Sequence, residues 1–215
     1  MIIALWPHRR DFASDMKYQN DYKGSTLLSN HKGSIMKMLF TAIVLTVATA
    51  TPVYAALNAG DTAPVFTTQA SLGGKEFTFS VVESLKKGPV VLYFYPAAFT
   101  EGCTVEAHDF AEAIDQYHAL GATVVGVSHD NIATLDKFSV SECGSKFPVA
   151  ADTDQRIMKS YDAVLAIKPE YANRTSYVIS PSGKIIYSFT DLSPEKHVEN
   201  TLAALRKWKT ENPTK

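Results

Sequence analysis

Residues 89–106 read PVVLYFYPAAFTEGCTVE, and this stretch decides the fold of the chain. Its first part, residues 90–95, is an unbroken run of β-branched, aliphatic and aromatic side chains. Such a run is typical of a strand that is buried on both faces of an α/β sheet. Pro96 ends the run, and a short loop leads to Cys103, where a helical pattern begins. Backbone amides and the helix dipole stabilise a thiolate at that position, so the stretch predicts a reactive cysteine between a strand and a helix.

Strand and helix patterns alternate along the rest of the chain. Gly73 and Gly74 separate two short strand-like segments, which predicts an N-terminal β-hairpin. Ser80 is the expected N-cap of a short helix after that hairpin. The further predicted elements are, in chain order, a helix over 103–120, a strand over 122–128, a helix from Asp130 to about 143, a strand over 147–151, a helix capped by Asp152 or Thr153, a hairpin around 181–183 and a last helix from 193–195 to about 210. This alternation predicts one α/β domain with a mixed central sheet and helices on both faces.

The chain of 215 residues begins with a segment that does not fit this pattern. Residues 36–55 combine a lysine, an apolar run and a small-residue end at Ala55, which predicts a secretory signal peptide that is cleaved after Ala55. The apolar run is shorter than the roughly 20 residues of a membrane-spanning helix, although an uncleaved anchor or a buried helix is the alternative interpretation. Residues 1–35 show no convincing period, and we interpret them as a mis-annotated N-terminal extension before a true start at Met36. We therefore expect an exported, periplasmic protein whose single domain spans residues 56–215.

Composition narrows the possible partners. Residues 56–215 carry 15 Lys and Arg against 19 Asp and Glu, a net charge of −4, and show no basic cluster. This balance argues against nucleic acid and against anionic membrane surfaces as partners. Both cysteines of the chain, Cys103 and Cys143, lie in this part, and export would permit a disulfide between them. Two cysteines are too few for a disulfide scaffold, so we expect them to serve chemistry.

The loop before the helix spaces three chemically suited residues as P-x-x-x-T-x-x-C. If the Cys103 thiolate attacks an O–O bond, the Thr100 hydroxyl can hydrogen-bond both the sulfur and an incoming oxygen. Pro96 has no amide proton and can shield the thiolate from water. A cation would complete the site by stabilising the thiolate and the charge on the leaving oxygen. Arg174, directly before the strand-like segment TSYVIS, is the candidate, because its guanidinium keeps its charge and presents a fixed set of donors.

Three segments carry a resemblance to a known family: VVLYFYPAAFTEGCTVEAHDF at 90–110, FPVAAD at 147–152 and RTSYVISPSGKI at 174–185. They resemble peroxiredoxins, and specifically the bacterioferritin-comigratory or Q-type branch. The resemblance implies a thioredoxin-like sandwich of three α/β/α layers. It implies a peroxidase that reduces hydrogen peroxide and organic hydroperoxides, in antioxidant defence of the cell envelope. It also implies a thioredoxin-like or other thiol reductant as partner, no cofactor or metal, and a monomer rather than a dimer.

The resemblance also assigns roles to individual residues. It places the peroxidatic nucleophile and the residues around it at Cys103, Pro96, Thr100 and Arg174. Glu106 matches a family position that orients the arginine, and Tyr95 occupies the aromatic position before the proline. The chain departs from the family at His108, where many Q-type members carry a resolving cysteine five residues after the nucleophile.

This departure leaves three alternatives for the recycling of the oxidised cysteine. Cys143 can act as the resolving thiol, which requires both helix ends to loosen, because the Cα atoms of a disulfide lie within about 7 Å of each other. Alternatively, an outside thiol reduces the sulfenic acid of Cys103 directly. In the third alternative, Cys143 is only a small buried apolar residue.

Two other classes of function compete with the peroxidase. A disulfide reductase or isomerase on the same fold needs a C-x-x-C pair, whereas residues 100–103 read TEGC. A non-catalytic binding or chaperone module on the thioredoxin fold has no need of the combined proline, threonine, cysteine and arginine. Four histidines show no convincing metal-ligand spacing and are expected at the surface: His108, His118, His129 and His197.

Overall fold

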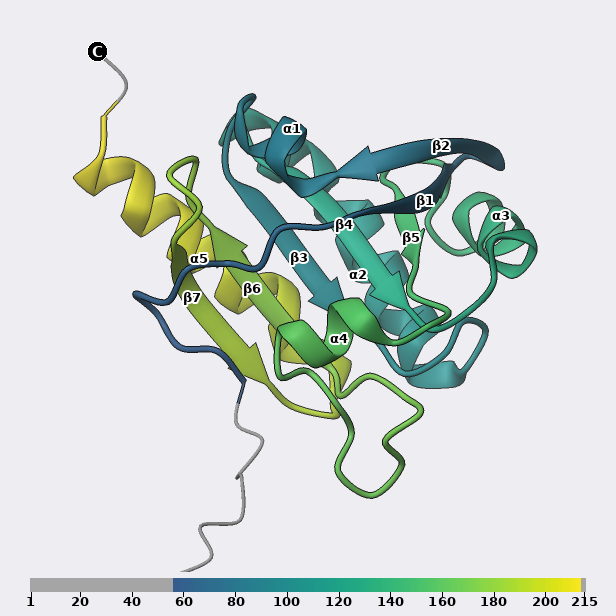
Figure 1. Cartoon of the computed structure of the whole chain (residues 1–215). Helices are drawn as coiled ribbons and strands as arrows, with labels where there is room; N and C mark the ends of the chain where they lie inside the picture. Colours follow the sequence, from purple (N-terminus) through teal and green to yellow (C-terminus); the bar gives the residue numbers. More distant parts are fainter. Residues whose placement is uncertain (1–55, 214–215) are drawn as a thin grey trace, which may run out of the picture. The chain divides into compact units, whose positions relative to one another are not determined.

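The computed structural model describes residues 56–213, so the predicted signal peptide and the segment before it lie outside the described residues. Within the described part, seven strands form one sheet in the order β2-β1-β5-β4-β3-β6-β7 (Figure 1). In chain order the elements are β1 (Thr67–Leu72), β2 (Lys75–Ser80), α1 (Val81–Leu85), β3 (Val90–Phe94), α2 (Glu101–Ala119), β4 (Thr123–Ser128), α3 (Ile132–Ser141), β5 (Val149–Ala151), α4 (Arg156–Ser160), β6 (Thr175–Ile179), β7 (Ile185–Thr190), the 3₁₀ turn η1 (Pro194–Lys196) and α5 (His197–Glu211). The predicted order of strands and helices is confirmed, including the N-terminal hairpin.

The strand that the sequence marks as central, β3, lies inside the sheet. It pairs in parallel with β4 and antiparallel with β6. β4 continues in parallel to β5, and a short antiparallel pairing joins β5 to β1. The hairpins β1–β2 and β6–β7 form the two edges. The sheet is therefore mixed, with parallel pairs at its centre and antiparallel pairs at its edges.

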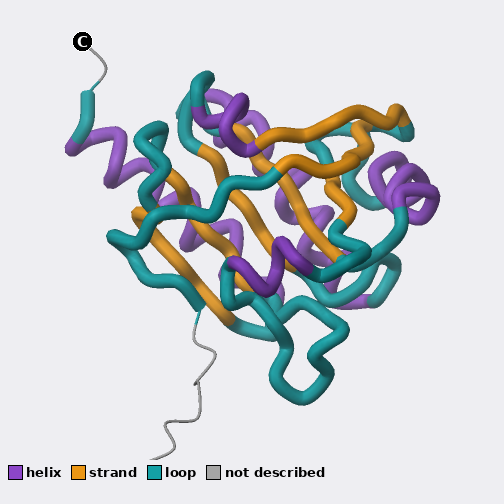
Figure 2. The backbone as a smooth tube through the Cα atoms, in the orientation of Figure 1, coloured by secondary structure: helices purple, strands orange, loops and turns teal. Residues whose placement is uncertain are grey.

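Helices cover both faces of this sheet (Figure 2). α2, α3 and α5 pack on one face, and α1 and α4 pack on the other. Along β3, Val91 and Tyr93 face the first group of helices, whereas Val90, Leu92 and Phe94 face the second. None of these five side chains is more than 1% exposed, as the apolar run predicts for a strand buried on both faces. The result is a thioredoxin-like α/β/α sandwich of three layers.

Three helices begin at residues other than those that the sequence predicts. α2 begins two residues early because Thr100, in extended backbone, is its N-cap, so Cys103 is the third helical residue. α3 uses Asn131 as its N-cap, whereas the predicted cap, Asp130, is bonded to the neighbouring loop. α4 begins later than expected, yet the Asp152 carboxylate still accepts two N–H groups of its first turn, at 2.9 and 2.8 Å. Of these three boundaries, the start of α3 is the one at which a side-chain hydrogen bond from another part of the chain engages the predicted cap.

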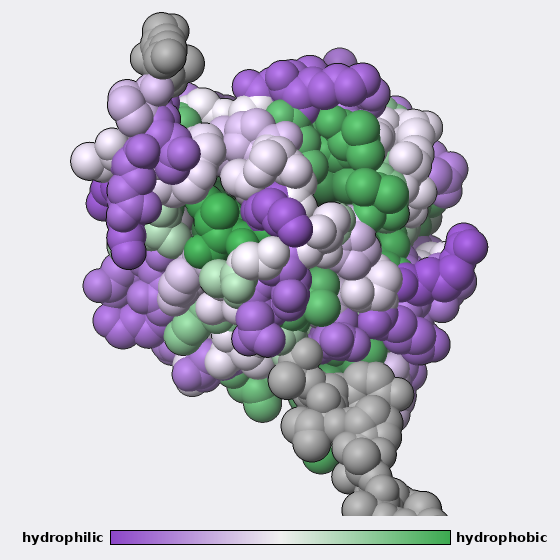
Figure 3. Space-filling model, turned by 60° about the vertical axis from the view of Figure 1, so that its left-hand side comes forward, coloured by the Kyte–Doolittle hydropathy of each residue, from purple (hydrophilic) through white to green (hydrophobic). Residues whose placement is uncertain are grey.

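Only part of the last helix packs into the core. Leu202 and Leu205 are buried, but Trp208 is only half-buried and lines a shallow groove with Tyr187 and Ala204. The face shown in Figure 3 carries hydrophilic residues with apolar areas between them. No helix within the described range combines the length and the apolar character that crossing a membrane requires.

Candidate active site

The loop between β3 and α2 is held by the end of the neighbouring strand β4. Asp130 Oδ2 accepts hydrogen bonds from the Ala98 backbone N–H and from the Ser128 hydroxyl, both at 2.7 Å. The His129 ring lies with Nδ1 3.1 Å from the carbonyl oxygen of Pro96, which is half-buried at the start of the loop. Because β3 and β4 are parallel neighbours, their carboxyl ends place these groups side by side. The loop is therefore fixed at two backbone positions before α2 begins.

The far end of this loop leads directly into α2. The Cys103 N–H donates to the Thr100 carbonyl oxygen at 3.0 Å, which closes the first turn. The Thr100 hydroxyl donates to the Ala97 carbonyl oxygen at 2.9 Å, so its proton is not directed at the sulfur as the sequence suggests. Phe99 has a φ of 64°, in the left-handed region that bulky side chains rarely adopt, and its ring packs edge-on against Phe138. The lone pairs of the Thr100 oxygen remain available to an incoming O–H donor.

Cys103 and Arg174 meet at the carboxyl end of β3. The cysteine is only 1% exposed, and Arg174 Nη2 donates to its sulfur at 3.5 Å. Arg174 directly precedes β6, whose antiparallel register sets Thr175 opposite Phe94, the last residue of β3. This register brings together two side chains that are 71 residues apart in the chain.

The Arg174 guanidinium has partners in three directions. Besides Cys103, it donates through Nη1 to the Glu106 carboxylate and through Nε to the Leu192 carbonyl oxygen at 2.8 Å. Burial works against its charge, but the Glu106 and Cys103 groups outweigh that effect and raise the pKa of the guanidinium. A Cβ on Gly102 would lie 3.0 Å from Nη2, so only glycine leaves the guanidinium its full room. The arginine is thus a fixed cation, not a mobile surface charge.

Glu106 and His197 form a buried acid–histidine contact behind Arg174. Glu106 is fully buried, and burial raises the pKa of its carboxyl to about 8, although Arg174 acts in the opposite direction. His197, which the sequence analysis places at the surface, is also fully buried, and its Nδ1 lies 3.6 Å from Glu106 Oε1. Helical spacing was the available signal, since His197, Thr201 and Leu205 follow one another every four residues on the buried face of α5.

Tyr95 connects the strand to the active-site loop by packing. Its ring lies between those of Tyr93 and Phe138, with centroid distances of 5.5 Å to each. Burial is the largest cause that raises the pKa of its phenol, so the side chain is neutral. Tyr95 belongs to the same apolar cluster as Cys103 and supports the loop from inside the fold.

Cys143, the other cysteine, follows the end of α3 and is fully buried. Both cysteines are free thiols in this structure and belong to one apolar cluster. Burial raises the pKa of the Cys143 thiol, so this sulfur has little thiolate character while it stays in place. His108, at the position of the missing resolving cysteine, lies with Nε2 3.1 Å from the Glu142 carboxylate and ties α2 to the end of α3.

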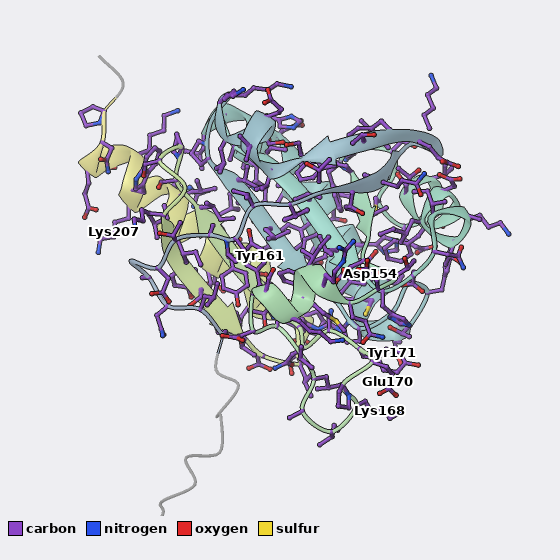
Figure 4. The ribbon with its side chains drawn as sticks, in the orientation of Figure 1. Asp154, Tyr161, Lys168, Glu170, Tyr171 and Lys207 are labelled. Carbon is purple, nitrogen blue, oxygen red and sulfur yellow. The ribbon has the colours of Figure 1, made fainter. Side chains whose placement is uncertain are left out.

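A long loop between α4 and β6 lies beside the end of β4. Lys168, Glu170 and Tyr171 lie on it (Figure 4), and it leads directly to Arg174. The Tyr171 ring packs edge-on against His129 with centroids 4.6 Å apart, and the Lys168 ammonium lies 5.8 Å from the Tyr171 ring centre. The part of the chain that the structure describes contains no cluster of three His, Cys, Asp or Glu side chains suited to a metal ion.

Comparisons with known proteins agree with this arrangement. The model of the AhpC/TSA family matches residues 59–188. Peroxiredoxin Bcp of Xanthomonas campestris pv. campestris is 31% identical over 123 residues, which cover 54% of this chain and 76% of that protein. The chloroplastic peroxiredoxin Q of Populus jackii is 31% identical over 156 residues, or 72% of this chain and 70% of that protein. The crystal structure of peroxidoxin BcpB from Mycobacterium tuberculosis superposes with a TM-score of 0.64 at 28% identity, over 70% of this chain and 97% of that one.

The fold and the site together define a class of protein: a thioredoxin-fold protein with a buried cysteine in the first turn of the helix after its central strand. The family match extends over more than half of the chain. The chain therefore belongs to the AhpC/TSA family, and the resemblance to its bacterioferritin-comigratory and Q-type branch is confirmed by relatives and by solved structures.

Proposed function

We propose that the protein is a thiol peroxidase that reduces hydrogen peroxide and organic hydroperoxides, with Cys103 as its peroxidatic nucleophile. One observation carries this proposal: the Arg174 guanidinium contacts the Cys103 sulfur with one terminal nitrogen and the Glu106 carboxylate with the other. A buried, oriented cation beside a cysteine in a first helical turn favours the thiolate. The family membership and the names of the relatives point to the same chemistry.

The reaction begins with the Cys103 thiolate. Its sulfur attacks the terminal oxygen of R–O–O–H, an S–O bond forms, and the O–O bond breaks. The sulfur gives up two electrons and becomes a sulfenic acid, while the departing RO⁻ takes a proton from solvent and leaves as an alcohol, or as water when R is hydrogen. Arg174 stabilises both the thiolate and the charge on the departing oxygen. The Thr100 oxygen accepts a hydrogen bond from the peroxide O–H and aligns it with the sulfur.

Cys143 is the resolving residue in this proposal. Its thiol attacks the sulfenic sulfur, releases water and leaves a disulfide, which a thioredoxin-like partner reduces with two thiols. Two observations support this role: both sulfurs belong to one apolar cluster, and Cys143 lies two residues beyond the end of α3. A loop at that position can move without unwinding the whole helix. The competing route is direct reduction of the Cys103 sulfenic acid by an outside thiol.

The rival functions have less support. Thr100 stands where a disulfide reductase has the first cysteine of its C-x-x-C motif, and its hydroxyl cannot form a disulfide with Cys103. A binding module would not need a buried cation beside its cysteine.

Export to the periplasm and action as a monomer stay predictions. A mature N-terminus at Ala56 in envelope fractions and the mass of the protein in solution by light scattering test them.

Stopped-flow measurement of peroxide consumption with a dithiol donor tests the proposed function. The wild type should turn over, Cys103→Ser should not, and Cys143→Ser should still complete its first turnover. Wild-type activity in Cys103→Ser would end the assignment of the nucleophile. Normal turnover of Cys143→Ser with thioredoxin-type donors would instead show that an outside thiol reduces the Cys103 sulfenic acid.

A further inference from the structure

The contact between Glu106 and His197 is not used in the reaction described above. Glu106 Oε2 is bound to Arg174, but Oε1 has no hydrogen-bond partner among the described residues and lies 3.6 Å from His197 Nδ1. Both side chains are 0% exposed. A buried carboxylate oxygen that is left without a donor is costly, so its state of protonation needs an explanation.

The other contacts of His197 decide which of its nitrogens carries hydrogen. Nε2 lies 3.0 Å from the Asp191 carbonyl oxygen, which can only accept, so Nε2 carries the hydrogen. Nδ1 lies 2.8 Å from the Ser176 hydroxyl and faces Glu106 Oε1. In a neutral ring, Nδ1 therefore accepts the Ser176 hydroxyl proton, and no hydrogen of His197 is directed at Glu106 Oε1.

The charges of the site also bear on the protonation state of Glu106. A Cys103 thiolate and a Glu106 carboxylate would place two negative charges on one guanidinium, that of Arg174. The site would then carry an uncompensated negative charge while almost fully buried, which is strongly unfavourable. One additional proton removes this excess, and Glu106 Oε1, which has no hydrogen-bond partner among the described residues and faces His197, is where it can be held.

We propose that the Glu106–His197 pair carries one proton while Cys103 is a thiolate, and that His197 is thereby a positioning residue that keeps Arg174 available to the sulfur. The inference rests on the proposed function of Cys103. With this proton in place, the guanidinium balances the thiolate alone. When the proton is lost at alkaline pH, the carboxylate competes with the thiolate for the same cation, and the thiolate is less stabilised.

The neighbouring charges agree with this arrangement. Burial raises the pKa of the Glu106 carboxyl and lowers that of the His197 imidazole, so this proton rests mainly on the carboxyl. The ionisable and polar groups that face the pair come from every element packed around it: Asp109 on α2, Arg174 and Ser176 at β6, Asp191 after β7 and Glu195 on η1. Arg174 is the single cation among them, and it is already bound to both Glu106 and Cys103.

Nuclear magnetic resonance of the reduced wild-type protein tests the proposal without any turnover. The ¹³C carboxyl shift of Glu106 and the ¹⁵N ring shifts of His197 should show one proton on the pair at neutral pH and its loss near pH 8. An ionised carboxyl beside a neutral imidazole at pH 6.5 would overturn the proposal. This measurement needs no peroxide, so its result does not depend on whether Cys103 reacts. A failure of Cys103 to react with peroxide would count against the proposed function, and the NMR result would still decide the protonation of the pair.

Variants of Glu106 and His197 test whether this proton affects the rate of reaction with peroxide. In wild type, the rate constant for peroxide should decline on an alkaline limb as the pair ionises; in Glu106→Gln, which is neutral at every pH, that limb should disappear. In His197→Asn the midpoint should fall by up to about one pH unit, because the protonated carboxyl loses the imidazole nitrogen that faces it at 3.6 Å. The exposed His118→Asn serves as the matched control and should leave the midpoint in place. A uniform loss of rate in His197→Asn with an unchanged midpoint would show a purely packing role and overturn the proposal.

Discussion

Arg174 Nη2 lies 3.5 Å from the Cys103 sulfur at the carboxyl end of the central strand. The antiparallel pairing of β3 with β6 sets this distance, because it delivers the arginine from the start of one strand to the end of its neighbour. The same guanidinium is bound to Glu106 and to the Leu192 carbonyl oxygen, so its position is determined from three sides. Reactivity should therefore depend on the shape of this cation as well as on its charge.

Replacing Arg174 by lysine tests the importance of shape. A single ammonium cannot reach the sulfur, the carboxylate and the Leu192 carbonyl together. The rate constant for peroxide should therefore fall by about 10²- to 10³-fold, the range for removing one oriented donor from a developing negative charge. Stopped-flow oxidation measures this rate. Arg206→Lys, in which an exposed arginine bonded to Gln116 is changed, should react as wild type does. Equal rates in Arg174→Lys and wild type would refute the role of the guanidinium.

Gly102→Ala should separate activity from stability. A Cβ at this position would lie 3.0 Å from Arg174 Nη2 and would push the guanidinium away from the sulfur. Alanine is otherwise well accepted in a helix, so the free energy of unfolding should change by less than about 1 kcal/mol. We expect slower reaction with peroxide in a protein of near-normal stability, measured by stopped-flow oxidation and by urea unfolding. Val105→Ala, at an exposed position of the same turn, is the control; an unchanged rate in Gly102→Ala would contradict the close contact.

Asp130→Ala should loosen the active-site loop. The substitution leaves the Ala98 N–H and the Ser128 hydroxyl without their acceptor, which costs about 1–3 kcal/mol of unfolding free energy. The loop should then exchange its amide hydrogens faster, and the reaction with peroxide should slow. Denaturant unfolding and hydrogen exchange measure the two effects. Asp115→Ala, at an exposed position of α2, should change neither. Slow exchange at Ala98 in Asp130→Ala would show that the loop is held elsewhere.

The folded state of Glu106→Gln should become more stable, relative to that of wild type, as pH rises. The folded-state pKa of this carboxyl is raised from 4.5 to about 8, so its contribution to stability is complete below the unfolded value and is lost as pH rises through the folded value. Glutamine does not titrate. The unfolding free energy of Glu106→Gln minus that of wild type should therefore increase by roughly 3–5 kcal/mol between about pH 5 and pH 8. Exposed Glu112→Gln should show a flat difference; a flat difference for Glu106→Gln would mean that the carboxyl is ionised throughout.

The sequence is sufficient for the parts of the site that local pattern determines. The apolar run before Pro96 marks β3, the spacing from Thr100 to Cys103 marks the start of α2, and the residue before TSYVIS supplies the cation. Partners that depend on side-chain contacts across the fold could not be predicted in this way. Asp130 resembles a helix cap in the sequence because nothing local shows that Ala98 lies beside it.

His197 shows the same limit for a buried polar residue. A histidine in the first turn of a helix that begins SPEKH reads as a surface residue, and only the packing of α5 on α2 places it beside Glu106. The position of Cys143 was predicted correctly near the end of α3, but sequence spacing does not show whether the loop after it can reach Cys103. That question depends on motion after oxidation, which local pattern does not encode.

The most direct test of the central claim is the intact mass of the reduced protein after one equivalent of hydrogen peroxide, compared among wild type, Cys103→Ser and Cys143→Ser. Oxidation through Cys103 predicts the loss of two hydrogens in wild type, the gain of one oxygen in Cys143→Ser and an unchanged mass in Cys103→Ser. If Cys103→Ser is oxidised as fast as wild type, Cys103 is not the nucleophile, and the account of the site is wrong.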